Sequence, residues 1–482
     1  MAFIRKVITS SGATAVQIAH KQYGKVVRIE HIGSAHTEYD LNRLVSLARN
    51  RLLAGQDSLF PDTHTPASSM YLKKSFSRLL LKVLLAEYKN LGFEKLCDKD
   101  FAHLCIARIV EPTSKEDSLR VLLDLGYTET STDKLYRCLS NVIEKDYLLQ
   151  ISKNCLEHAL SRGIRLVLYD VTTLYFETQK EDIYRRSGLS KERRLEPQIV
   201  IGLLVDQRGF PLDLHSFEGN VAETNTILPV LESFRKNHQI HSMTVVADAA
   251  MLSAKNIKTL SEAGYSYIVG SRLQKIPYGI AEYQKTGELA DNQLIVSKYD
   301  DYRIIYQYKD KRASLDKRNI RKQIEKAKRA IDGNRPVTRT KFLSLEASQK
   351  TLNQKLIDKA YALAGIKGYV TNLDIPNMEI ISAYHQLFNV EASFRMAKSD
   401  LKARPIFHHK RESIDAHLTV VFTALAIARS IEYKTSISIK RFVKTLRPIR
   451  AGLIVMDGKE YEAQELIPEN VRAILEKLNT GH

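Results

Sequence analysis

The stretch from Gly163 to Gly270 constrains the fold of this chain most, because short apolar runs alternate there with helical patterns. Strands are predicted at 164–170, 199–205, 210–217, 243–248 and 265–270, and helices at 223–236 and 253–263. Three strands, helix, strand, helix, strand is a mixed α/β order. Two of the predicted strands end in an aspartate, Asp170 and Asp248. The sequence therefore predicts an α/β core that delivers two carboxylates at strand ends.

A later run, from Tyr384 to Lys398, predicts a single helix with two distinct faces. Polar side chains at offsets 0, 7, 11 and 14 fall close to one line along a helix, and they are Tyr384, Glu391, Arg395 and Lys398. A second face is apolar, with Val390, Phe394, Ala397 and Leu401. A carboxylate and two cations are thus expected to look out from a helix whose back is buried. This pattern suits an acidic metal ligand flanked by groups that hold phosphate.

Three carboxylates, Asp170, Asp248 and Glu391, are candidates for one site. Two neighbouring strand ends with a helix packed across them can bring such acids together, where they would repel one another. Two Mg²⁺ ions would relieve that repulsion, since hard oxygen ligands match Mg²⁺ and an ion pair can act on a phosphodiester. A lone Asp at a strand end is also common as a turn or capping residue. The residues alone leave both interpretations open.

Net charge indicates the class of partner. The chain has 73 Lys and Arg against 55 Asp and Glu, a formal charge of +18, which favours a polyanion. We find no uninterrupted apolar run of 18 residues and no secretory h-region, so no membrane partner is expected. Four cysteines without a C-x-x-C pair suggest neither a zinc site nor a disulfide framework. A reducing cytoplasm is the simplest location.

The chain divides into six predicted segments. They are a β-hairpin plus helix (1–56), a helical region that is a candidate DNA-end-binding domain (70–162), the first part of the core (163–271), an insertion (272–375), the second part of the core with the Glu-bearing helix (376–435), and a tail (436–482). A polar stretch, Asp57–Ser69, is predicted to be a linker. The helices predicted in the second segment are 71–91, 98–109, 115–125, 132–139 and 146–160.

Three further features have competing interpretations. The run Lys309–Lys341 holds 13 basic against 4 acidic residues, which fits either a DNA-binding surface or a solvated helix face. The segment Ser131–Leu139 is either a recognition helix or simply part of a packed helical domain. The adjacent His408 and His409 point apart on any regular element, so we expect surface or phosphate contacts rather than a metal site.

The order Asp170, Asp248, Glu391, with Tyr384 seven before the Glu and Lys398 seven after it, resembles the DDE transposases of the IS4-like superfamily. Their tyrosine–arginine–glutamate–lysine motif has that spacing. Further stretches resemble the IS1634 family, and they are Pro197–Leu204, Phe217–Asn220 with Glu223 and Thr224, Ala247–Met251, Lys398–Pro405 and Ile414–His417. The likeness covers about residues 95 to 430.

The resemblance implies a ribonuclease H-like catalytic core, a mixed sheet flanked by helices and interrupted by a mainly β insertion. It implies that Asp170, Asp248 and Glu391 bind two Mg²⁺ ions, for which Mn²⁺ can substitute, and that Tyr384 and Lys398 hold DNA phosphates. It also implies a prokaryotic enzyme that cuts and rejoins double-stranded DNA, at element terminal repeats and in target DNA, as a homodimer in the synaptic complex. Such a protein would be nucleoid-associated when bound to DNA.

This chain departs from the motif at one position. The arginine expected three residues after the tyrosine is Leu387 here, which cannot make a bidentate phosphate contact. Arg395 is the candidate replacement cation. Two rival functions remain, a related metal-dependent nuclease without strand transfer and a non-catalytic DNA-binding relative acting as a repressor. No glycine-rich phosphate loop is present, which argues against an ATP-driven motor.

Overall fold

The structure is a computed structural model of the chain, and it describes residues 2–10, 12–53, 70–189, 194–240, 243–249, 251, 254–271, 273, 275–333, 340–346 and 349–480. It forms two compact units, one of Met1–Tyr71 with Val455–Glu460 and the other of Leu72–Ile454 with Tyr461–His482. The predicted linker, Asp57–Ser69, lies outside the described residues.

The first unit contains a three-stranded antiparallel sheet covered by one helix. Its elements are β1 (Ala2–Ile8), β2 (Thr14–Gln22), β3 (Lys25–Ala35) and α1 (Glu38–Leu53), with the strands in the order β1-β2-β3. The helix packs on the sheet over Val16, Ile18 and Ala48. β2 and β3 form an antiparallel hairpin, and β1 adds a third strand because the chain also turns between Ile8 and Thr14. Gly12 turns the chain there with φ 77°, a conformation that glycine adopts without a side-chain clash.

Helices dominate the beginning of the second unit. Its elements up to residue 161 are β4 (Met70–Phe76), α2 (Arg78–Asn90), η1 (Phe93–Leu96), α3 (Lys99–Val110), α4 (Ser118–Asp124), α5 (Thr132–Glu144) and α6 (Tyr147–Ser161). The predicted helix from 71 to 91 was wrong in its first turns. Those residues form β4, which takes its place in a sheet of order β16-β15-β4 and obtains backbone hydrogen bonds there instead of in a helix.

An eight-stranded mixed sheet lies at the centre of the second unit. Its order is β10-β11-β14-β9-β8-β5-β6-β7, and only the β9–β8 and β8–β5 pairs are parallel. The strands are β5 (Val167–Tyr175), β6 (Gln198–Asp206), β7 (Pro211–Glu218), β8 (Thr244–Ala247), β9 (Ser266–Ser271), β10 (Leu294–Lys298), β11 (Arg303–Tyr308) and β14 (Ile366–Thr371). Between β7 and β9 lie η2 (Glu223–Asn225), α7 (Ile227–His238) and α8 (Ala254–Glu262). The mixed α/β prediction therefore holds.

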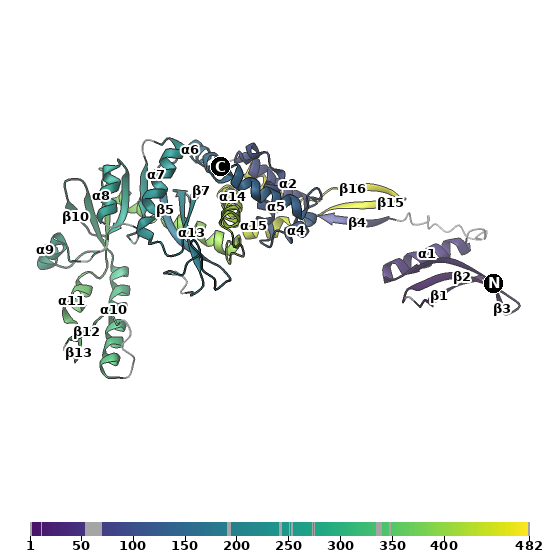
Figure 1. The fold of residues 1–482 in the computed structure, drawn as a ribbon, viewed down its shortest axis with the longest axis horizontal. Helices are drawn as coiled ribbons and strands as arrows, with labels where there is room; N and C mark the ends of the chain where they lie inside the picture. The colour runs from purple at the N-terminus through teal and green to yellow at the C-terminus, as the bar shows by residue number, and fades with distance from the viewer. Residues whose placement is uncertain are drawn as a thin grey trace. The chain divides into compact units, whose positions relative to one another are not determined.

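The resemblance implied a mainly β insertion, but the segment from 272 to 375 is not mainly β. It contains α9 (Tyr278–Thr286), α10 (Asp310–Ile331) and α11 (Gln354–Ala362), besides β10, β11, β14 and a hairpin of β12 (Leu343–Glu346) and β13 (Gln349–Leu352). Three of its strands extend the central sheet, because β14 pairs with β9 and β11 pairs with β14. Of the remaining elements, α10, α11, β12 and β13 are grouped together in Figure 1.

Within the basic run, Asp310–Ile331 forms a helix with one apolar face. In α10 the buried residues are Ala313, Ile320, Ala327 and Ala330, which recur at helical spacing. Ile320 and Ala327 pack with Phe342 and Ile357 in a small core of their own. Most of the Lys and Arg side chains are therefore left on the solvated side of the helix.

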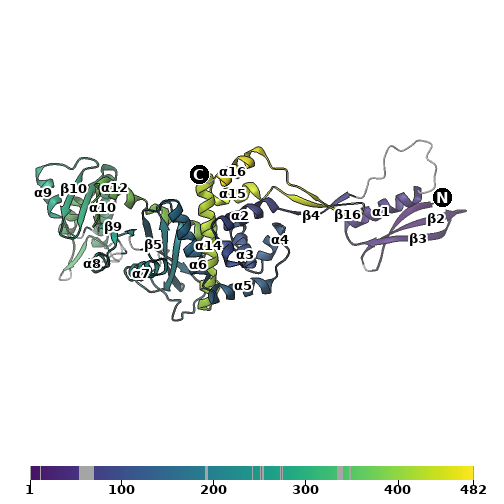
Figure 2. The same cartoon turned by 90° about the horizontal axis from the view of Figure 1, so that it is seen from above.

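A long buried helix, α14 (Arg411–Thr435), joins the two halves of the second unit. It packs against α2, α3, α5, α6 and β7. Figure 2 shows α2, α3 and α5 on one side of it and α6 on the other. By length and composition this helix could cross a membrane, but 89% of its most apolar 18-residue stretch is buried inside the protein. The chain ends with α15 (Ile439–Leu446), β15 (Ala451–Met456), β16 (Lys459–Ala463) and α16 (Glu469–Thr480).

Candidate functional site

The register of two parallel strands places the first two acids side by side. In the β5–β8 pair, Tyr169 lies opposite Ala247, so Asp170 and Asp248 are the next residues on each strand. Neighbouring strands are about 4.8 Å apart. Asp248 directly follows the last residue of β8, as the sequence predicted. Both carboxylates therefore start from adjacent points of one sheet.

Asp170 is not at the end of its strand. β5 continues to Tyr175 because its other neighbour, β6, pairs with it along its whole length, with Asp170 opposite Leu203. The aspartate instead marks the point where the pairing of β5 with β8 ends. Its Oδ1 accepts a hydrogen bond of 2.8 Å from the backbone N–H of Val171.

The predicted single helix is broken into three pieces. They are α12 (Asn377–His385), α13 (Phe388–Arg395) and η3 (Met396–Asp400), which is a π-helical turn. The helical hydrogen-bond spacing shortens to three residues where the Leu387 N–H donates to the Tyr384 carbonyl. It widens to five residues where the Leu401 N–H donates to the Met396 carbonyl. The predicted apolar face is buried all the same, at Val390, Phe394, Ala397 and Leu401.

These breaks change which polar side chains share a direction. α12 packs on β8, β9 and β14, while α13 packs on β5 and β6. Tyr384 is consequently buried, whereas Glu391 and Arg395 are exposed and Lys398 lies in the π-helical turn. The four residues do not form the single polar line that a continuous helix would give.

Tyr384 is tied to the second aspartate. Its hydroxyl donates a hydrogen bond of 2.6 Å to Asp248 Oδ1. Burial, and then this bond, raise the pKa of Tyr384, so the hydroxyl stays protonated and remains a donor. Gly270 of β9 makes the approach possible, because a Cβ there would lie 2.6 Å from the Tyr384 hydroxyl oxygen.

All three acids line one cavity. It has a volume of about 290 Å³, and its lining residues are Tyr169, Asp170, Asp248, Lys367, Tyr384, His385, Leu387, Phe388, Val390 and Glu391. The structure therefore brings together Asp170, Asp248, Glu391 and Tyr384. Arg395 and Lys398 are not among the lining residues. Arg395 instead lies near enough to Arg429 to contribute to lowering the pKa of that guanidinium.

Lys367 is the lining cation that the sequence analysis missed. It comes from β14, and its Nζ lies 4.1 Å from the centre of the Tyr384 ring. Burial and the charge of Arg312 lower the pKa of Lys367, while Asp248 and Glu391 act in the opposite direction. Its ammonium therefore interacts electrostatically with Asp248 and Glu391, two of the three acids.

The donor set of this cavity suits a hard divalent cation. Three carboxylates supply oxygen ligands of the kind that Mg²⁺ prefers. Among the described residues, no three His, Cys, Asp or Glu side chains are close enough together to hold a metal ion as they stand. One oxygen of Asp248 is occupied by Tyr384. The chemistry of the residues fits the ion, and side-chain adjustment would be needed to complete the coordination.

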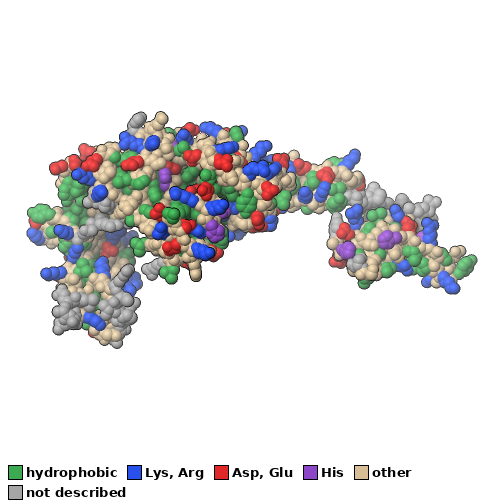
Figure 3. Space-filling model, viewed as in Figure 1, with side chains coloured by type: hydrophobic (Ala, Val, Ile, Leu, Met, Phe, Trp, Pro, Cys, Tyr) green, Lys and Arg blue, Asp and Glu red, His purple; other side chains and the backbone are tan. Residues whose placement is uncertain are grey.

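The other candidates lie elsewhere in the second unit. Lys134, Tyr136 and Arg137 are exposed on α5, whose opposite face packs on α3 and α14. His408 is partly buried in contact with Lys115, and His409 lies 3.0 Å from Arg185 Nη1. On the face shown in Figure 3, Lys and Arg side chains are spread among Asp and Glu rather than gathered into one patch.

Comparison with known proteins gives a family match. The family described as "Transposase DDE domain" matches residues 161–427, a segment that contains all three acids. A similar solved structure is the cryo-EM structure of a piggyBac transposase synaptic complex with hairpin DNA. It is 11% identical, has a TM-score of 0.42, and the match covers 77% of this chain and 79% of that one. No curated protein matches the chain.

Proposed function

Because this chain belongs to the family of transposase DDE domains, we propose that it is an insertion-sequence transposase that cuts and rejoins DNA at the ends of its element. The observation that carries the proposal is the convergence of Asp170, Asp248 and Glu391 on one cavity from β5, the end of β8 and α13. These residues lie 78 and 143 positions apart in the chain, so their meeting is a property of the fold.

Asp170, Asp248 and Glu391 would hold two Mg²⁺ ions. When bound, such ions activate a water or a 3′ hydroxyl and stabilise the charge on the leaving oxygen. The remaining work falls to the chain's own residues. Tyr384 orients the Asp248 carboxylate through its hydroxyl, and the Lys367 ammonium offsets phosphate charge at the cavity wall. This is positioning and charge stabilisation, without a covalent enzyme intermediate.

Several finer assignments belong to the same proposal. The central sheet with its helices fits a ribonuclease H-like core, and the sequence motifs favour the IS1634 family. The net charge of +18 supports double-stranded DNA, both element ends and target, as the partner. Two ends must be brought together, which favours a homodimer on DNA. The segment 70–162 remains the proposed end-binding region, and Lys398 a proposed phosphate contact outside the cavity.

Replacing Asp170 by Asn tests the proposal directly. It removes one carboxylate charge with little change of shape, so cleavage of DNA carrying the element ends should fall by at least about 100-fold. Binding to the same DNA should change little. A matched control is Asp300→Asn, an exposed aspartate in the turn after β10. If D170N cleaves at the wild-type rate, the assigned site is wrong.

A strand-joining assay separates the proposal from its rivals. A transposase joins the freed 3′ end to a second DNA duplex, whereas a metal-dependent nuclease only cuts. A repressor would bind the ends and do neither. The presence of all three acids at one cavity favours an enzyme over the repressor.

A further inference from the structure

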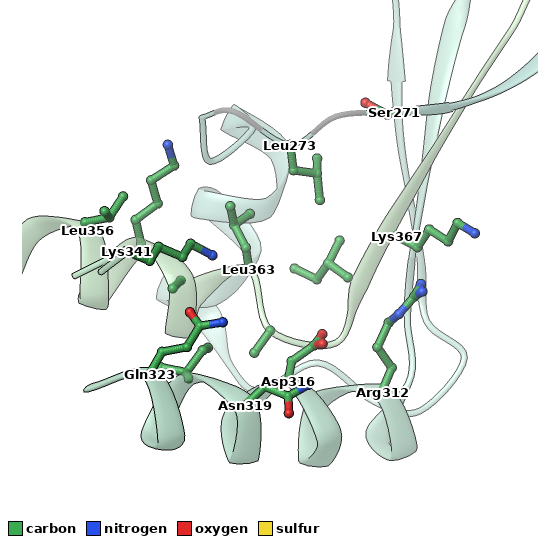
Figure 4. Close-up of a pocket in the computed structure, with 15 residues that line it drawn as sticks. Ser271, Leu273, Arg312, Asp316, Asn319, Gln323, Lys341, Leu356, Leu363 and Lys367 are labelled. Atoms are coloured by element: carbon green, nitrogen blue, oxygen red, sulfur yellow. The ribbon is translucent and has the colours of Figure 1, made fainter. Parts of the chain in front are cut away.

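A second cavity opens beside the catalytic one. It has a volume of about 600 Å³ and lies between α10, α11, β14 and the end of β9, as Figure 4 shows. Cavities of this size are typical of ligand sites. The two cavities share one lining residue, Lys367. The two cavities therefore adjoin at Lys367.

The lining of this second cavity is basic. Its cations are Arg312, Lys341, Lys359 and Lys367. It has one acid, Asp316, whose Oδ2 accepts a hydrogen bond of 3.0 Å from the Gly365 N–H. Arg312 and Lys367 lie at the same end of the cavity in Figure 4, and Lys341 lies toward the other. This distribution suits a ligand that carries more than one negative charge along its length.

The remaining lining groups are apolar or neutral. Leu273, Ile320 and Leu363 form aliphatic walls, and Asn319 and Gln323 bring amides from α10. The Gln323 Oε1 is buried and has no hydrogen-bond partner among the described residues. An unsatisfied buried acceptor costs free energy unless a ligand supplies a donor. Cations, aliphatic walls and amides together match the phosphate, sugar and base edge of a nucleotide.

We propose that this cavity binds a single-stranded segment of DNA adjacent to the scissile phosphate, with Arg312 and Lys367 holding a backbone phosphate where the two cavities meet. This inference rests on the proposed function, because it assigns a binding site to one part of the DNA substrate. A basic groove combined with contact surfaces for bases is how proteins take up single strands. Lys367 acts here through the phosphate next to the one that reacts, which makes it a positioning residue.

The test compares two arginines of the same helix. Both side chains are exposed on α10, but Arg312 lines the cavity and Arg318 does not. Binding of a short labelled single strand to the full chain is measured by fluorescence anisotropy over a range of salt, with chelator present so that no cleavage occurs. R312Q should weaken binding by about 5- to 10-fold and reduce the salt slope by about 0.7, the share of one phosphate. R318Q should change binding by less than about twofold.

Several outcomes decide between the inference and its alternatives. Equal losses in R312Q and R318Q would show general electrostatic attraction only and would overturn the inference, and so would equal weakening of single-strand and blunt-duplex binding in R312Q. K341Q should reproduce the selective loss at the other end of the cavity, which keeps the test open if R312Q does not fold. A chain that binds no DNA would refute the proposed function as well, whereas a chain that cleaves ends normally without the R312Q effect would refute this inference alone.

Discussion

Replacing Tyr384 by Phe tests how the site is organised. The substitution keeps the aromatic ring, which packs at 5.0 Å between centroids against Tyr369 and faces the Lys367 ammonium. It removes only the hydroxyl that donates to Asp248 at 2.6 Å. The Asp248 side chain is exposed, so this hydrogen bond restricts its choice of rotamer. Without it, the carboxylate must be ordered at the moment of reaction.

The expected magnitude follows from the type of bond. A hydrogen bond to a charged group contributes about 1.5–3 kcal/mol. If the full amount acts in the transition state, kcat/KM falls by about 10- to 150-fold, since 1.36 kcal/mol corresponds to a factor of ten. Because burial and Asp248 raise the pKa of Tyr384, the hydroxyl is a donor throughout the neutral range and the loss should not depend on pH there.

The assay is end cleavage measured at several Mg²⁺ concentrations. The control is Tyr267→Phe, which removes another buried tyrosine hydroxyl. That hydroxyl accepts a hydrogen bond of 3.2 Å from Ser261, and Tyr267 does not line the cavity. It should cleave at nearly the wild-type rate. A Y384F variant that cleaves as fast as wild type would refute the orienting role. Faster cleavage at low Mg²⁺ would refute it as well, and would mean that the hydroxyl competes with the metal for Asp248.

Two further variants test the packing beside Tyr384 and a buried charge outside the site. Gly270→Ala places a Cβ 2.6 Å from the Tyr384 hydroxyl oxygen, so it should displace that side chain and lose cleavage to at least the extent of Y384F. A Gly287→Ala control, at an extended backbone position with open space around its Cβ, should not affect cleavage. Lys115→Met tests a buried charge far along the chain from the three acids: burial, and then Arg108, lower the pKa of Lys115 to about 7. Because this folded-state pKa lies below the unfolded one, stability rises with pH between them and is lost as pH falls toward 7. Met should therefore raise the free energy of unfolding at pH 7 by about 2–3 kcal/mol, less than the pKa difference alone would give because the contact of Lys115 with His408 is lost. It should also flatten the rise of stability with pH, as measured by urea denaturation. An unchanged pH dependence would contradict the assignment.

The sequence predicted the α/β core and the two aspartates because buried strands have a strong local signature. It misjudged the position of Asp170, because the end of an apolar run was taken as the end of the strand, whereas β6 pairs with β5 well beyond it. The helix prediction failed for a different reason. Offsets of 7, 11 and 14 describe a continuous α-helix, and apolar periodicity alone cannot reveal the shortened turn at Leu387 or the π-helical turn after Arg395.

The segment between β9 and α12 shows the limit of resemblance. Its mainly β character was taken from relatives, whereas the apolar positions Ala313, Ile320 and Ala327, seven residues apart, already indicated a helix in this chain. The part of the site that comes from this segment, Lys367, could not be predicted from local pattern. A lysine beside a strand is common, and its place at the cavity depends on β14 pairing with β9, a contact made across about a hundred residues.

That pairing bears on the missing motif arginine. Leu387 lines the cavity and is 9% exposed, so an uncharged side chain occupies the helix position where the motif has its cation. Arg395 does not line the cavity and therefore does not replace it there. The positive charge at the cavity comes instead from the sheet, through Lys367, with Arg312 of α10 close enough to lower its pKa. A bound phosphate would favour the charged form of that lysine against its burial. Substrate binding and lysine protonation should therefore be coupled in this chain.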